Sequence, residues 1–270
     1  MSEIPHLDRA IGLPSSESHA QEEYESHIRE IYETRGVNPY ENFELPKTER
    51  DKEIIDFVQQ SLDQYLAIYN REKIVSVPVS KIHIFSENGV KDFTNGNVEK
   101  GSAAIKFGSM LVERPASDIQ FALNVFHEMV HLKSYSAVQI VNQPEGLEII
   151  NYRSGFSVTS REGKNLYFQD LEEGVIGFLV RRFYQEHVQN NTIFSEKRAM
   201  YNYSRDEEYG KLEALIQDLW EKNQDKFENI KSIWDIFINT QLNGNLLPIG
   251  RLIESTYGKG SFRKLGENNL

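Results

Sequence analysis

The sequence predicts an α+β fold in which helical segments at both ends of the chain enclose strands in its middle. Apolar residues recur at helical spacing from Ser15 to about Arg35, and again after Thr48 as far as about Tyr69. The period changes to two around residues 74–85, where β-branched and other apolar residues dominate. Helical spacing returns in the last third. We therefore expect two largely helical parts with a strand-containing core between them.

Length and composition fit one domain with a substantial core. The chain has 270 residues, 39% of them hydrophobic. We expect a single domain over 1–270, divided into a helical part (1–72), a core (73–190) and a second helical part (191–270). The sequence shows neither a run of 18 apolar residues nor a basic, apolar leader. These observations predict a cytoplasmic protein without a membrane span.

Charge and cysteine content narrow the partners and the chemistry. The net charge of −11 and the pI near 5.2 argue against nucleic acid or an anionic membrane as a partner. The chain contains no cysteine, which excludes a disulfide scaffold and a thiolate metal site. Oligomeric state is not predicted by these features.

In the N-terminal half, the spacing of apolar residues is irregular at first and then predicts helices and strands. Residues 1–14 hold two prolines and are expected to form a loose arm. Thr48 is the expected cap of the second helix. Residues 103–112 read as one strand, which Pro115 ends. Ser117 and Gln120 match a capping box and should start a helix that ends soon after Ser136.

The second half alternates briefly between strand and helix before becoming helical. The segment after the first central helix looks like a β-hairpin, with its β-like stretch at about 149–158. A helix is then expected from Gln169 to about His187. Three more helices follow by pattern, around residues 212–220, 230–238 and 246–257, and Gly258 should end the last one.

The residues that carry chemistry lie in the central helix. The sequence His127-Glu128-Met129-Val130-His131 places two histidines four residues apart, hence on one face of a helix. Two imidazoles on one face can bind one metal ion, and zinc accepts nitrogen ligands in a tetrahedral set. Glu128 follows the first histidine and is placed to take a proton from a water molecule at that metal. The apolar flanks predict a buried helix.

This motif resembles the zinc helix of the zincin metallopeptidases. The resemblance implies a zincin-like fold with a small mixed β-sheet packed on the zinc-binding helix, a Zn²⁺ cofactor and a peptide or protein substrate. It also implies that Glu128 is the general base and that His127 and His131 bind zinc. In zincins the strand before this helix often forms the edge that binds an extended substrate, so residues 103–112 are either that edge or an ordinary core strand.

We expect Glu173 to be the third zinc ligand, with three other carboxylates as alternatives. Metzincins carry a glycine and a histidine where this chain has Ser134 and Ala137, which excludes that branch. Gluzincins take a glutamate from a later helix, and Glu173-Gly174 resembles their pattern. Glu173 could instead close a capping box with Asp170. The other candidates for the ligand are Glu172, Glu148 and Asp206.

Zincins usually have one more group that stabilises the oxyanion of the tetrahedral intermediate. The candidates in this chain are Tyr203, which we would test first, and Tyr201, Tyr209, Arg153 and His187. The sequence thus predicts a zinc metallopeptidase of gluzincin type. One rival is a zincin-fold protein whose metal is structural or whose role is to bind a partner. The other is a helical interaction protein without a metal.

Overall fold

The computed structural model describes residues 6–12, 17–34, 40, 43–69, 76–95, 101–143, 146–195 and 206–268. It confirms the α+β class. Its helices within these ranges are α1 (Glu17–Thr34), α2 (Glu49–Ile68), α3 (Gly89–Phe93), α4 (Asp118–Lys133), α5 (Gln169–Phe183), α6 (Asp206–Lys222), α7 (Ile230–Asn243), α8 (Leu247–Tyr257) and α9 (Ser261–Asn268). Among these residues, none of the helices is long and apolar enough to cross a membrane.

A small mixed sheet precedes α4. It consists of β2 (Ile82–Phe85), β3 (Gly101–Ala104) and β4 (Ser109–Glu113) in the order β2-β4-β3. The central strand, β4, is parallel to β2 and antiparallel to β3. The prediction of one strand over 103–112 is therefore wrong. Ile105–Phe107 form a 3-10 turn, and Gly108 adopts a positive φ of 55° that lets the chain reverse. Both β2 and β3 lie at edges of this sheet, and β3 is the edge strand that packs against α4.

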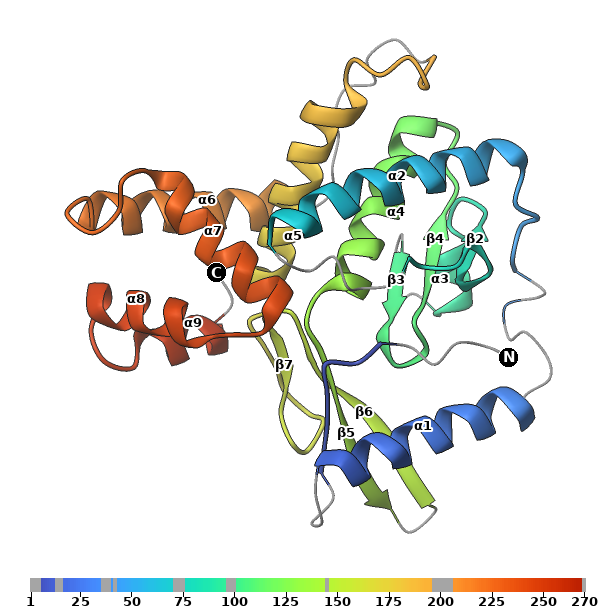
Figure 1. Ribbon diagram of the computed structural model, residues 1–270, viewed down its shortest axis with the longest axis horizontal. Helices are drawn as coiled ribbons and strands as arrows, with labels where there is room; N and C mark the ends of the chain where they lie inside the picture. The colour runs from blue at the N-terminus through green and yellow to red at the C-terminus, as the bar shows by residue number, and fades with distance from the viewer. Residues whose placement is uncertain are drawn as a thin grey trace.

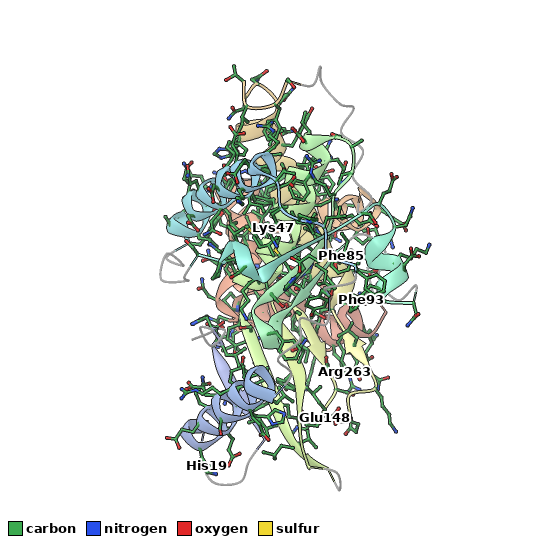
Figure 2. The ribbon with its side chains drawn as sticks, turned by 90° about the vertical axis from the view of Figure 1, so that its right-hand side faces the viewer. His19, Lys47, Phe85, Phe93, Glu148 and Arg263 are labelled. Atoms are coloured by element: carbon green, nitrogen blue, oxygen red, sulfur yellow. The ribbon has the colours of Figure 1, made fainter. Side chains whose placement is uncertain are left out.

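A second sheet has the order β1-β5-β6-β7-β8 and contains the expected hairpin. The strands are β1 (Arg9–Ile11), β5 (Ser136–Gln143), β6 (Gly146–Ser154), β7 (Ser157–Thr159) and β8 (Leu166–Tyr167). Helix α1 lies across the β5–β6 hairpin (Figure 1). The labelled His19 of α1 and Glu148 of β6 accordingly lie at the same end of the molecule (Figure 2).

The N-terminal segment is ordered where it meets this hairpin. Residues 9–11 pair in parallel with β5, so the prediction of a loose arm is wrong for them. The reason is a pair of hydrogen bonds just before the strand. The backbone N–H of Ser136 donates to Asp8 Oδ2 (2.9 Å), and the N–H of Asp8 donates to the Ser136 carbonyl (3.0 Å). Sequence periodicity does not reveal such a long-range pairing.

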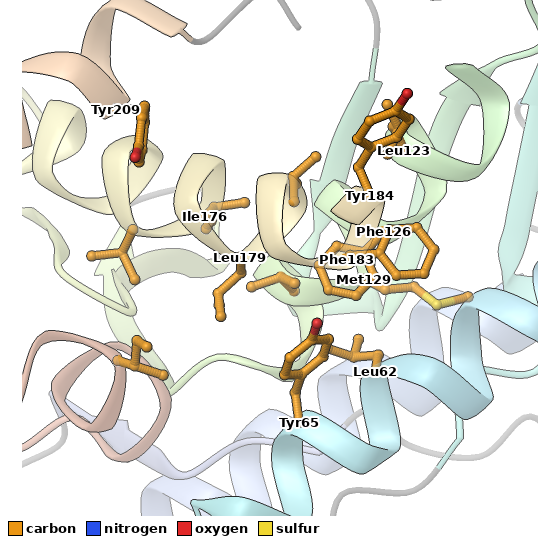
Figure 3. Packing of buried hydrophobic residues seen from close by; sticks show 14 of the residues in the cluster. Leu62, Tyr65, Leu123, Phe126, Met129, Ile176, Leu179, Phe183, Tyr184 and Tyr209 are labelled. Atoms are coloured by element: carbon orange, nitrogen blue, oxygen red, sulfur yellow. The ribbon is translucent and has the colours of Figure 1, made fainter. Parts of the chain in front are cut away.

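The main apolar core lies where α2, α4 and α5 meet. In Figure 1, α2 runs across α4 and α5. Phe126 of α4 stacks on Phe183 of α5, with 4.3 Å between ring centroids. Leu62 and Tyr65 of α2 point toward these rings (Figure 3). The first helical part of the chain therefore packs directly on the central helix, and burial of these rings stabilises the position of α4.

The helix ends follow the expected signals in part, and α4 ends at Lys133, before the predicted end soon after Ser136, where β5 begins. Thr48 caps α2 in a reciprocal capping box with Asp51, and the Ser117 hydroxyl accepts from the Gln120 N–H at the start of α4. Gly258 ends α8, but α9 follows it and was not predicted. At the far end of α5, Tyr184–Val188 continue as a π-helical turn.

Candidate metal centre

Two histidines converge on one side of α4. His127 and His131 lie one helical turn apart, and their Nε2 atoms are 3.1 Å from each other. The side chain of His127 is 9% exposed and that of His131 is 14% exposed. His127, Glu128 and His131 offer ligand atoms that all lie within 4.8 Å of one another. The structure therefore brings the sequence motif together as a group that could hold a metal ion.

Helix α5 adds a carboxylate to this group. Glu173 Oε2 lies 3.5 Å from His127 Nε2, and Glu173 Oε1 lies 3.6 Å from His131 Nε2. Glu173 is thus the later carboxylate that faces both ring nitrogens. The neighbouring glycine, Gly174, packs against α6. A Cβ on Gly174 would lie 2.9 Å from the Glu208 carbonyl and from Leu212, so the close approach is to α6.

The separations in this group are near those of ligand atoms around one metal ion, for which zinc gives the scale. Atoms about 2.0–2.2 Å from one zinc at tetrahedral angles lie roughly 3.3–3.6 Å apart. The two Nε2 atoms are 3.1 Å apart, slightly closer than this, and they lie 3.5 and 3.6 Å from the two different oxygens of Glu173. Two imidazoles and one carboxylate are also a donor set that zinc accepts, with a fourth position left for water. The residues present could therefore hold a metal ion, and zinc is one that accepts these donors.

Glu172 occupies a different place, behind His131. Its Oε1 lies 3.1 Å from Nδ1 of His131, the ring nitrogen that faces away from His127. Glu172 Oε1 also accepts from the Ser154 hydroxyl (3.0 Å), and Glu172 Oε2 accepts from the N–H of Ser157 (3.2 Å). A carboxylate on the second nitrogen of a metal-binding histidine orients the ring and makes it a better ligand. This geometry suits Glu172 to supporting His131.

The start of α5 does not follow the expected cap. The N-cap is Phe168, in a left-handed conformation with φ 61°, and no side chain caps the helix. The capping-box interpretation of Asp170 and Glu173 is therefore wrong. Glu172 and Glu173 are instead both buried, 3% and 7% exposed. Burial of two adjacent carboxylates costs free energy unless cations or hydrogen-bond donors compensate for it. Such buried charged groups are common at functional sites.

The surrounding carboxylates alter the protonation of His131. Burial alone lowers the pKa of this imidazole, but the negative charge of Glu173, the hydrogen bond to Glu172 and the charge of Glu128 outweigh it. The pKa of His131 rises to about 9. A divalent cation would balance the same cluster of carboxylates.

Glu128 lies between α4 and the edge strand. Its Oε1 is 3.9 Å from His127 Nε2. A Cβ built on Gly101 of β3 would come within 2.4 Å of the same oxygen. The absence of a side chain at Gly101 therefore makes room for the Glu128 carboxylate. Sequence reasoning missed Gly101, although a glycine at the start of a strand is a known sign of close approach.

The two remaining ligand candidates receive less support. Glu148 is exposed on the β5–β6 hairpin, in the half of the molecule that carries α1 (Figure 2). Asp206 is the first residue of α6, and its side chain lies outside the part of the chain that the structure describes. The geometry thus favours Glu173 among the three candidate carboxylates whose side chains the structure describes, the others being Glu172 and Glu148.

The proposed oxyanion-stabilising residues are placed as follows. Tyr203 and Tyr201 lie outside the described residues. Tyr209 stacks beside Trp234 and donates to Glu213 (2.5 Å), and His187 packs against Phe183 and Tyr65. Arg153 lies over the Tyr135 ring and donates to the carbonyls of Gly155 and Gly244. Tyr209, His187 and Arg153 are thus engaged in packing and hydrogen-bond contacts of their own. These contacts do not support any of the three as the residue that stabilises the oxyanion.

Comparisons with known proteins give no relative for this chain. No family model matches the sequence, and no curated protein or solved structure matches it significantly. The functional interpretation therefore depends on the geometry of the site and on the motif.

Proposed function

We propose that this protein is a zinc-dependent hydrolase that cleaves peptide bonds. The observation that carries the proposal is the convergence of His127, His131 and Glu173 at separations suited to one zinc ion, with Glu128 beside them. The three converging side chains would hold the ion. When bound, zinc supplies a Lewis acid that polarises a carbonyl and lowers the pKa of a coordinated water toward neutrality.

Glu128 is the residue that moves the proton. Its carboxylate accepts the proton of the attacking water and then delivers it to the nitrogen of the leaving amine. The side chain is largely buried, and Gly101 lies directly against it. A fixed position of this kind keeps the carboxylate near the reacting atoms and limits its competing contacts with bulk water.

The edge strand supports a peptide as the substrate class. β3 lies at the end of the three-stranded sheet, and its first residue is the one that contacts Glu128. An extended peptide can pair with an edge strand through main-chain hydrogen bonds. Pairing along β3 would bring a peptide carbonyl toward the metal group, which explains why an edge strand and a general base are neighbours.

The test measures metal and activity on matched variants. We expect about one zinc per wild-type chain, and a sharply weakened affinity in His127→Ala and Glu173→Ala. Glu128→Gln should keep the metal and lose cleavage of a mixed peptide pool, measured by mass spectrometry. Ser102→Ala, on the same edge strand, serves as the control. Full activity in Glu128→Gln would contradict the mechanism, and failure of wild type to bind zinc would contradict the site.

One observation favours a second candidate, a structural metal in a protein that binds a partner. The side chains of His127, Glu128 and Glu173 are each only 9% exposed, and a metal held among buried side chains can contribute folding free energy. The candidates differ in peptide cleavage. If the metal is structural, wild type and Glu128→Gln both bind it and neither cleaves any of the peptides. A catalytic metal requires cleavage that Glu128→Gln abolishes.

A further inference from the structure

We infer that Gln241 and Ser154 are positioning residues for the metal centre, which they support by holding Glu172 against His131. This inference rests on the proposed metal-binding function of the site. Gln241 belongs to α7, in the C-terminal helical part, and lies far along the chain from the histidine motif. Neither residue touches the ring nitrogens that face the metal. Both act through the carboxylate behind His131.

The contacts of Gln241 join three segments at one point. Its side chain is fully buried, at 0% exposure. The Nε2 group donates to Glu172 Oε1 (3.3 Å) and to the hydroxyl of Ser134 (2.9 Å), the residue that ends α4. The Oε1 atom accepts from the N–H of Phe156 (3.1 Å). One amide therefore connects the end of the histidine helix, the β6–β7 turn and the Glu172 carboxylate.

The backbone of the same region strengthens this connection. The N–H of Tyr135 donates to the Gln241 carbonyl (3.1 Å), and the N–H of Gly155 donates to the Tyr135 carbonyl (2.7 Å). Gly155 has a positive φ of 52°, and a Cβ there would lie 2.2 Å from Gln241 Nε2. The turn thus requires glycine for its conformation and for the space that Gln241 fills.

The consequence for His131 follows from how imidazole binds a metal. Glu172 is buried, so its charge needs hydrogen-bond donors. Ser154 and Gln241 supply side-chain donors to its Oε1, the oxygen that also faces His131 Nδ1. A carboxylate fixed at Nδ1 favours the tautomer with its proton there, which leaves the Nε2 lone pair for the metal. Loss of a donor should loosen Glu172, and the His131 ring with it.

The experiment compares metal affinity in two variants of neighbouring α7 residues. Gln241→Met removes both polar atoms at similar volume. Thr240→Val is the matched control, because Thr240 is 1% exposed on the same helix but donates to the Asn245 carbonyl instead. The full-length protein is stripped of metal, and zinc affinity is measured by competition with a chelator. The visible absorption of bound Co²⁺ reports the ligand geometry, and thermal unfolding of the metal-free protein reports stability.

We expect Gln241→Met to weaken zinc affinity by about 10–100-fold and to change the Co²⁺ spectrum, while Thr240→Val matches wild type. Ser154→Ala should weaken affinity in the same direction, and it decides the matter if Gln241→Met does not fold. Lower stability with unchanged affinity and spectrum would reduce Gln241 to a structural residue and overturn the inference, with the proposed function intact. Wild type that binds no metal would overturn both.

Discussion

Replacing Gly101 by alanine would test the placement of the proposed general base without touching a proposed metal ligand. Gly101 opens the edge strand β3 and lies against the Glu128 side chain. An added Cβ would come within 2.4 Å of Glu128 Oε1, 2.9 Å of its Cδ and 3.0 Å of its Cγ. The backbone of Gly101 pairs with Val112, so the strand is held in place on one side. The carboxylate is therefore the part that must move.

The size of the movement sets the expected loss of activity. Ordinary van der Waals contact of a Cβ begins at 3.4 Å, so the oxygen must withdraw by about 1 Å. Misplacement of a catalytic group by about 1 Å can lower the rate about 100-fold. We expect Gly101→Ala to lose about that factor in kcat/KM. Zinc affinity should stay within about threefold of wild type, because the new methyl group meets Glu128 and not the imidazoles.

The assay combines peptide cleavage with metal titration. Rates on a peptide that wild type cleaves are compared for wild type, Gly101→Ala and Ser102→Ala, the last being the adjacent residue of β3. Zinc affinity and thermal stability are measured on the same preparations. Full activity in Gly101→Ala would refute the placement of Glu128 as base. An equal loss of activity in Ser102→Ala would show that substitutions in β3 lower activity by disturbing the strand itself, and not by displacing Glu128.

Two further predictions concern the scaffold. Phe126→Ala should cost about 3–5 kcal/mol of unfolding free energy in urea, since the ring is fully buried and stacks on Phe183. Asp51→Asn should cost about 1–3 kcal/mol at neutral pH. Burial raises the pKa of Asp51, but hydrogen bonds from Thr48 and Arg114 outweigh it and hold the pKa below its ordinary value. That stabilisation is complete above about pH 4 and is lost as pH falls through the lowered pKa, so the variant's deficit should shrink in acid.

Each of these scaffold predictions has a clear contrary result. A loss under 1 kcal/mol in Phe126→Ala would mean that the α4–α5 contact is not packed as described. A deficit of Asp51→Asn that stays constant from pH 7 to pH 3 would show that the carboxylate is not charged and paired in the folded state. Urea titrations at the two pH values measure both quantities.

Local sequence rules predicted the parts of the site that lie within one helix. His127 and His131 share a face because residues four apart lie one above the other on any α-helix. Glu128 follows from the same motif, and Ser117 marks where that helix begins. The start of helix α2 was equally predictable, because Thr48 and Asp51, which form its capping box, lie within four residues of each other. These features need only short-range geometry.

The β structure was less predictable, because strand partners lie far apart in the chain. Residues 103–112 look like one strand by composition, yet Gly108 reverses the chain and makes two. Arg9–Ile11 have no strand pattern of their own and become a strand only because β5 offers its edge to them. The pairing of β1 depends on a partner strand more than a hundred residues away, so the spacing of apolar residues within β1 cannot predict it.

The choice between Glu172 and Glu173 shows most directly what tertiary structure adds. The sequence by itself determined the α+β class, the histidine pair and a short list of carboxylates. Adjacent residues on a helix point about 100° apart, so only one of the two glutamates can face the Nε2 atoms. Which one does so depends on how α5 docks on α4. That docking places Glu173 before both imidazoles and Glu172 behind His131, where Gln241 of α7 reaches it. Rotation of a helix about its axis is set by the packing of its apolar face, and that face belongs to the assembled core.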